Sequence, residues 1–184
     1  MSKPKPHFIS GERVYLSPID EGDIDFYVRW LNALGVRENL MIQRPLTVMA
    51  ERDWMAKLEE RGDVVFGIRL VADDSLIGNT GLHRINDIDR HAEFGIFIGP
   101  PEQRRRGHGT EATRLTLAYA FDVLNLHRVW LRYYAYNAGA GKVYEACGFV
   151  GEGIARRAHW HTGDWHDEHL MGVLAEDYYA GREK

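Results

Sequence analysis

The sequence contains a single cysteine, Cys147, in 184 residues. One cysteine excludes an internal disulfide and a zinc site built from several cysteines, and it is typical of a reducing compartment. Long hydrophobic runs are also absent. No stretch approaches the ~20 apolar residues that span a bilayer, and residues 1–7 form a polar tail without an apolar signal core. We therefore expect a cytoplasmic protein that makes no contact with membranes.

The chain also lacks a surplus of basic charge. It carries 23 Lys and Arg against 27 Asp and Glu, which gives a net charge of −4. Basic residues that are scattered and offset by acids do not favour binding to phosphate backbones, so we expect no nucleic-acid partner. No internal repeat, low-complexity tract or linker divides the sequence. We expect one domain over residues 8–178, with short tails at 1–7 and 179–184.

The first half of the chain predicts two helices followed by strands. After a short strand at 13–16, acidic residues indicate a helix over 24–34 that Gly35 ends. Thr47 is a candidate N-cap of a second helix, which Gly62 follows. Residues 64–71, 76–85 and 91–98 are then typical of strands in an antiparallel meander.

The second half predicts a crossover between two strands. Residues 107–124 have helical spacing and lie between the strand at 91–98 and another at 127–134. A helix at 138–147 and strands at 149–155 and 165–173 follow. These elements predict an α/β fold with a mixed, mainly antiparallel central sheet, a splayed parallel pair near its middle, and flanking helices.

The segment 103–110 has the composition of an anion-binding loop. It contains Gly107 and Gly109, and three consecutive arginines precede them at the start of the predicted helix. Glycines let a ligand approach the main chain, and helix N-termini attract anions such as a pyrophosphate. Two other interpretations remain open: a tight turn with solvated arginines, and a Rossmann fingerprint, which lacks the acid expected about 20 residues later. A P-loop is excluded because the segment has no Gly-Lys-Ser/Thr.

A wider set of residues extends this motif through most of the chain. It comprises Arg104-x-x-Gly107-x-Gly109, Glu111-Ala112, residues 126–129, Asn137, Ala140, Tyr144-Glu145, Gly148-Phe149, Gly163-x-Trp165-x-Asp167 and Met171. In this pattern, over roughly residues 10–175, the chain resembles the GNAT N-acetyltransferases, in particular the branch of ribosomal-protein N-terminal acetyltransferases and spermidine acetyltransferase. One departure is Gly141, where the family commonly has a bulky aliphatic residue.

The resemblance implies a GNAT-like domain that transfers acetyl from acetyl-CoA to an amine by direct attack in a ternary complex. The acceptor is then a protein N-terminus or a small-molecule amine, including a polyamine such as spermidine. The family pattern assigns the pantetheine to the main chain of Phe97 and Ile98 and to Asn137, although Asn137 is equally an N-cap. It assigns the pyrophosphate to the loop residues Arg104, Arg105, Arg106, Gly107, His108, Gly109 and Thr110.

The family pattern also indicates the catalytic groups. Tyr144 falls at the tyrosine that protonates the departing thiolate, although an aromatic on a short helix is also typical of a core. Glu93 is our candidate for a base that acts through water, and its alternative is a solvated strand carboxylate. His83 and Asp87 are further candidates for the base.

Three further features bear on the site and on assembly. We interpret His159, His161, His166 and His169 as part of a polar hairpin rather than a metal site. Trp30 and Trp54 could line an acceptor groove, but aromatics at helical spacing are typical of a core, and we expect them there. A homodimer through an exposed strand edge or the C-terminal strands is an open expectation. The alternative from another class is a non-catalytic acyl-CoA-binding sensor or interaction module.

Overall fold

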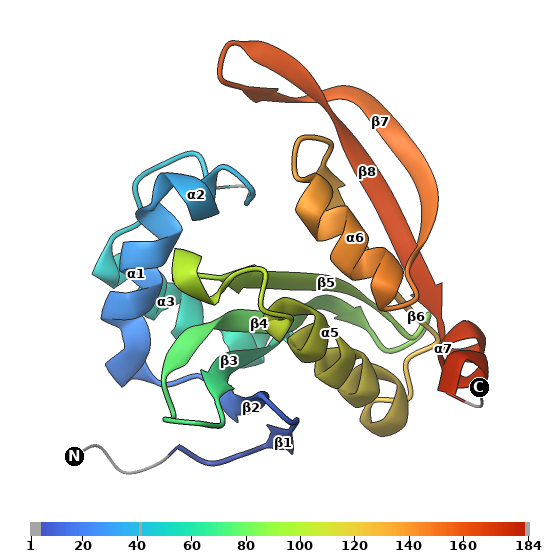
Figure 1. Ribbon diagram of the computed structural model, residues 1–184, viewed down its shortest axis with the longest axis horizontal. Helices are drawn as coiled ribbons and strands as arrows, with labels where there is room; N and C mark the ends of the chain where they lie inside the picture. The colour runs from blue at the N-terminus through green and yellow to red at the C-terminus, as the bar shows by residue number, and fades with distance from the viewer. Residues whose placement is uncertain (1–4, 41, 183–184) are drawn as a thin grey trace.

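The computed structural model describes residues 5–40 and 42–182, and it contains one eight-stranded sheet in the order β1-β2-β3-β4-β5-β6-β8-β7 (Figure 1). The strands are β1 (Ile9–Ser10), β2 (Val14–Pro18), β3 (Val64–Leu70), β4 (Leu76–Asn86), β5 (His91–Ile98), β6 (Arg128–Tyr134), β7 (Val150–His161) and β8 (Asp164–Leu174). The helices are α1 (Ile24–Asn32), α2 (Leu34–Arg37), α3 (Val48–Ala56), α4 (Leu58–Arg61), α5 (His108–Ala118), α6 (Ala138–Ala146) and α7 (Ala175–Arg182). Short 3-10 helices lie at Glu21–Asp23 and Pro101–Gln103, and a π-helical segment, Tyr119–Val123, continues α5.

The pairing confirms the predicted mixed sheet. Neighbouring strands are antiparallel except β5 and β6, which are parallel because α5 crosses between them. Their register runs from His91 opposite Arg128 to Glu93 opposite Trp130 and goes no further. Beyond Glu93, β5 keeps its pairing with β4 while β6 diverges. This divergence, which we call the splay, is the predicted opening near the middle of the sheet.

Helices cover both faces of the sheet, as the alternation of side chains along β3 shows. Phe66 and Ile68 pack in a cluster with Ala112 of α5. Gly67, which points the other way, lies beneath Tyr27 of α1. The α5 face therefore carries most of the aliphatic core, and the α1 face carries a smaller cluster around Tyr27 and Leu31.

Two predicted helices are broken into shorter ones. The helix predicted over 24–34 ends at Asn32, whose side chain bonds with Val28 and with both backbone groups of Leu46. Gly35, predicted to end that helix, lies inside α2 instead. The Thr47 hydroxyl caps α3 as predicted, 3.1 Å from the Ala50 nitrogen, but the helix breaks at Lys57 before α4 begins.

The C-terminal hairpin is longer than the sequence predicts. Strands β7 and β8 extend well beyond α6 (Figure 1). They meet at Thr162 and Gly163, which both have positive φ, as a two-residue hairpin turn requires. After β8, α7 continues to Arg182 and so includes residues that we assigned to a tail; Arg182 pairs with Asp122 at 2.8 Å. Among the described residues, no helix is long and apolar enough to cross a membrane.

Candidate active site

The predicted pyrophosphate loop forms the N-terminus of α5. Gly107 has a φ of 84°, in the left-handed region, and it precedes a helix whose first turn has no side-chain cap. The first N–H groups of a helix lack partners within it, so those of His108, Gly109 and Thr110 are available to an anion. A Cβ added at Gly109 would come no closer than 4.0 Å to the rest of the protein. We call these N–H groups at residues 108–110 the cradle, and it has open space above Gly109.

The three arginines of the loop are placed differently. Arg105 and Arg106 are exposed beside the cradle. The Arg104 guanidinium turns inward and donates hydrogen bonds to the carbonyls of Ile98, Gly99 and Gly35 at 2.9–3.0 Å. Arg104 thus ties the loop to the end of β5 and to α2, which leaves Arg105 and Arg106 as the side chains free to meet a phosphate.

The splay leaves one edge of β5 without a strand partner from Phe94 onward. Phe97 and Ile98, the predicted pantetheine residues, pair with Asn79 and Gly78 of β4 on the other edge. Unpaired strand groups bind extended ligands through main-chain hydrogen bonds. Asn137 caps α6, since its side chain accepts from the Ala140 nitrogen at 3.3 Å. Its contact with pantetheine stays a prediction.

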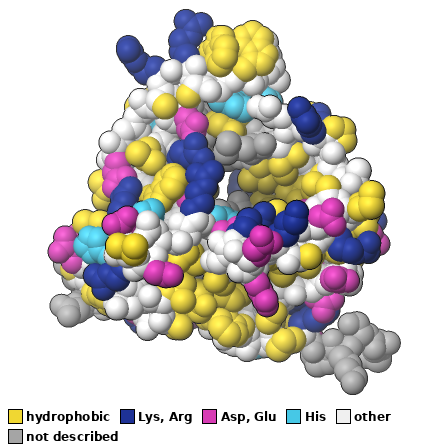
Figure 2. Space-filling model, turned by 180° about the vertical axis from the view of Figure 1, so that it is seen from behind, with side chains coloured by type: hydrophobic (Ala, Val, Ile, Leu, Met, Phe, Trp, Pro, Cys, Tyr) yellow, Lys and Arg dark blue, Asp and Glu magenta, His cyan; other side chains and the backbone are white. Residues whose placement is uncertain are grey.

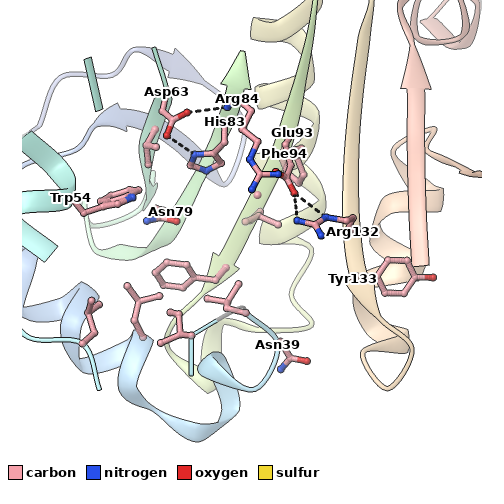
Figure 3. A pocket seen from close by; sticks show the side chains of 18 of the residues that line it. Asn39, Trp54, Asp63, Asn79, His83, Arg84, Glu93, Phe94, Arg132 and Tyr133 are labelled. Carbon is pink, nitrogen blue, oxygen red and sulfur yellow. Dashed lines mark hydrogen bonds and ion pairs between the residues drawn. The ribbon is translucent and has the colours of Figure 1, made fainter. Parts of the chain in front are cut away.

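A cavity of about 850 Å³ lies on the α1 face and reaches the splay. Figure 3 shows Trp54, Asn79 and Phe94 around it, and Figure 2 shows a hollow at the middle of the far side of the molecule, rimmed by hydrophobic and basic side chains. Leu31, Leu40, Ile42 and Leu46 give the cavity an apolar wall. Trp54, which we expected in the core, therefore lines the cavity instead. Trp30 packs against Gly99, as a core residue does.

Glu93, the candidate base, lies in the cavity wall at the point where the splay begins. Its carboxylate pairs with Arg132 at 3.2 Å (Figure 3) and with Arg84 at 3.0 Å. Arg132 also pairs with Glu168 at 3.0 Å. A water bound to Glu93 would have to share the carboxylate with these two arginines. The other two candidates for the base lie in different places. His83 lines the cavity, and its Nδ1 lies 3.3 Å from the Asp63 carboxylate. Asp87 is exposed in a turn.

Tyr144 is buried on α6, on the α5 face of the sheet. Its ring contacts those of Phe94 and Tyr133, which both line the cavity on the opposite side of the splay. Burial raises the pKa of Tyr144 to about 12, with smaller contributions from Tyr133 and Cys147. The phenol is therefore protonated at neutral pH, as a proton donor must be.

Tyr133 also explains the departure at Gly141. A Cβ added at Gly141 would lie 2.7 Å from the Tyr133 hydroxyl oxygen, so Tyr133 leaves no room for a larger side chain at position 141. The hydroxyl also approaches His169 Nδ1 at 3.4 Å. Strand alternation alone did not single out Tyr133, because its significance depends on α6 packing against it.

The histidines of the hairpin form ring stacks. His159 stacks on Tyr134 with ring centroids 3.7 Å apart, and His161 stacks on Tyr136 at 4.9 Å. The Tyr136 hydroxyl donates to the Glu38 carbonyl, so the residue on which the turn end of the hairpin stacks is joined to the end of α2. No group of three His, Cys, Asp or Glu side chains within residues 5–40 and 42–182 is arranged to hold a metal.

Comparisons with known proteins identify the family. A model of the GNAT acetyltransferase domain matches residues 13–150. The Bacillus subtilis protein named "Probable N-acetyltransferase YjcK" is 32% identical over 174 residues, covering 82% of this chain and 94% of that protein. Spermidine N(1)-acetyltransferase of Vibrio cholerae is 37% identical over 113 residues, covering 60% of this chain and 65% of that protein.

Solved structures agree with the sequence matches. The crystal structure of spermidine N-acetyltransferase from Vibrio cholerae, in complex with CoA and spermine, superimposes with a TM-score of 0.85 at 27% identity, covering 92% of this chain and 99% of that one. These similarities confirm the predicted fold, the acyltransferase activity and acetyl-CoA as the acyl donor. The chain therefore belongs to the GNAT family of acetyl-CoA-dependent N-acetyltransferases.

Proposed function

We propose that this enzyme transfers the acetyl group of acetyl-CoA to a primary amine of a polyamine, and that donor and acceptor meet at the splay. The observation that carries the proposal is the placement of the two sites. The α5 cradle and Tyr144 lie on one face of the sheet, and the cavity lies on the other, with β5 between them. The similarity to a structure that holds CoA and spermine supports the same acceptor class.

Each group of the site then has a distinct task. The α5 amides with Arg105 and Arg106 hold the pyrophosphate, and the free edge of β5 after Phe94 orients the pantetheine and the thioester. The neutral amine attacks the thioester carbonyl carbon, and the C–S bond breaks as the tetrahedral intermediate collapses. Glu93 takes the proton of the amine through a water, and the Tyr144 hydroxyl protonates the leaving sulfur.

Direct attack needs no acyl-cysteine. Burial raises the pKa of the Cys147 thiol to about 11, and its sulfur lies 3.5 Å from the Thr110 carbonyl. A thiol in this state is a weak nucleophile at neutral pH. Cys147 therefore contributes to packing between α5 and α6.

The test is steady-state release of the CoA thiol with a panel of acceptors, together with mass spectrometry of the products. We expect turnover with spermidine and spermine and a singly acetylated product. Turnover only with a peptide that has a free N-terminus would contradict the polyamine proposal and assign the enzyme to protein substrates. Tight binding of acetyl-CoA without turnover of any amine would favour the sensor function instead.

A further inference from the structure

Glu51 is the cavity carboxylate that lacks a partner. It lies in the first two turns of α3, it is 4% exposed, and its side chain lines the cavity. Within the described residues, no hydrogen bond or ion pair engages its carboxylate. Burial raises its pKa above the ordinary value for a glutamate. Glu51 therefore bears a desolvation cost that no group within residues 5–40 and 42–182 offsets.

The other carboxylates of the cavity are all neutralised. Asp63 pairs with Arg61 and His83, and Glu93 with Arg84 and Arg132. Glu168 also pairs with Arg132. A cation that enters the cavity therefore finds these three carboxylates already paired with guanidinium or imidazole groups. Among the described carboxylates that line the cavity, Glu51 alone has no such partner.

Glu51 lies on the β3 side of the cavity. It is close enough to Tyr27 to contribute to the raised pKa of that phenol, after burial and Asp23. The Tyr27 hydroxyl is itself buried and has no hydrogen-bond partner in the part of the chain that the structure describes, and it lies 3.2 Å from a Cβ added at Gly67 of β3. This part of the site therefore holds two buried polar groups, one acidic and one neutral, beside an apolar wall.

On the proposed function, the reacting amine lies at the free edge of β5, two strands away from Gly67. Gly67 is in register with Asn79, and Asn79 with Phe97 on the free edge of β5. Two strand spacings amount to about 10 Å. A single ammonium group does not cover that distance, whereas a linear amine with a second nitrogen several carbons away does, with its methylenes along Leu31 and Leu46.

We propose that Glu51 binds a second, non-reacting ammonium group of the acceptor and so selects linear diamines and polyamines over monoamines. The proposal rests on the proposed function, because it assigns a specificity residue to the same cavity. A buried carboxylate that meets an ammonium gains a charge-assisted hydrogen bond, while a monoamine leaves it without a partner.

The test is the variant Glu51→Gln, which keeps the shape of the side chain and removes its charge. We expect KM for spermidine to rise by roughly 10- to 100-fold, with kcat and KM for acetyl-CoA changed little. The rate with a monoamine such as hexylamine should stay the same. Asp53→Asn, an exposed acid on the same helix, is the matched control and should behave as wild type.

Calorimetric titration of 1,6-diaminohexane into the CoA-bound protein gives a second readout that does not need turnover. The wild type should bind the diamine at least tenfold more tightly than Glu51→Gln does, and Glu51→Asp should retain part of the affinity. Equal affinity of wild type and Glu51→Gln, with polyamine turnover intact, would overturn the role of Glu51 and leave the proposed function standing. A wild type that neither binds nor acetylates any diamine or polyamine would overturn both proposals.

Discussion

Arg13 joins Glu111 to the pyrophosphate loop. Its Nε donates to Glu111 Oε2 at 2.9 Å, and its terminal nitrogen donates to the carbonyl of Arg106 at 3.2 Å. Glu111 Oε1 also accepts from the backbone nitrogens of Glu12 and Arg13, at 2.6 and 2.9 Å. The segment before β2 thereby holds the first turn of α5 and the loop in one arrangement.

Replacing Glu111 should weaken binding of acetyl-CoA although Glu111 is not placed on the ligand. In Glu111→Gln the charged contact to Arg13 is lost, so the loop is no longer held in a single arrangement. We expect the dissociation constant to rise roughly 5- to 30-fold, which corresponds to about 1–2 kcal/mol. Titration calorimetry measures this dissociation constant, and Glu12→Gln, a change at a neighbouring residue, is the control. Equal affinities for Glu111→Gln and wild type would contradict this positioning role.

The same carboxylate should contribute to stability at low pH. Burial acts to raise the pKa of Glu111, but hydrogen bonds from Arg13, Glu12 and Val14 outweigh it, and the pKa lies below the ordinary value of 4.5. The folded state therefore favours the ionised form, and the contribution is complete above pH 4.5 and lost as the pH falls through the folded pKa. Denaturation by urea between pH 7 and 3 should show a shallower acid decline for Glu111→Gln than for wild type.

Tyr144→Phe should lower kcat and leave substrate binding almost unchanged. Removing the proposed proton donor would leave a thiolate as the leaving group, and we expect a loss of roughly 100-fold in kcat. Because burial raises the pKa of Tyr144 to about 12, the wild-type rate should show no alkaline decline from this group below about pH 11. Tyr133→Phe is the matched control. A larger loss in Tyr133→Phe than in Tyr144→Phe would transfer the role to Tyr133.

The two glycines of α6 should respond in opposite ways to alanine. Nothing lies within 4 Å of a Cβ at Gly139, so Gly139→Ala should raise the free energy of unfolding by about 0.5–1 kcal/mol. Gly141→Ala brings its Cβ to 2.7 Å from the Tyr133 hydroxyl and should lower it. Combining Gly141→Ala with Tyr133→Phe should recover part of the loss. Urea denaturation of these three variants and the wild type measures the changes, and equal gains for both glycines would show that the Tyr133 side chain moves aside at no cost.

The architecture was predictable because its signals are local. The glycines at 107 and 109, the Thr47 cap and the alternation along β3 to β5 all follow from chemistry within a few residues. The length of the C-terminal hairpin was not predictable, because β7 is almost wholly exposed and shows no apolar face. Gly35 was misassigned because the side chain of Asn32 ends α1 by bonding with Leu46, a contact distant in sequence.

The cavity residues required the fold. Glu51 is one more acid in the first turns of a helix, where acids are common. Its significance appears only once burial and the pairing of Asp63, Glu93 and Glu168 are known. The three loop arginines also could not be told apart from the sequence. Only the fold shows that Arg104 turns inward and donates hydrogen bonds to three carbonyls.

The most direct test of the acetyl-CoA site is titration calorimetry of acetyl-CoA into wild type and Gly109→Glu. A side chain at Gly109 enters open space, so this variant should fold with an unchanged midpoint of thermal unfolding while it fills the cradle with a negative charge. We predict binding by the wild type and a loss of at least 100-fold in Gly109→Glu. Equal binding by both proteins, or none by the wild type, would contradict a pyrophosphate site at the N-terminus of α5.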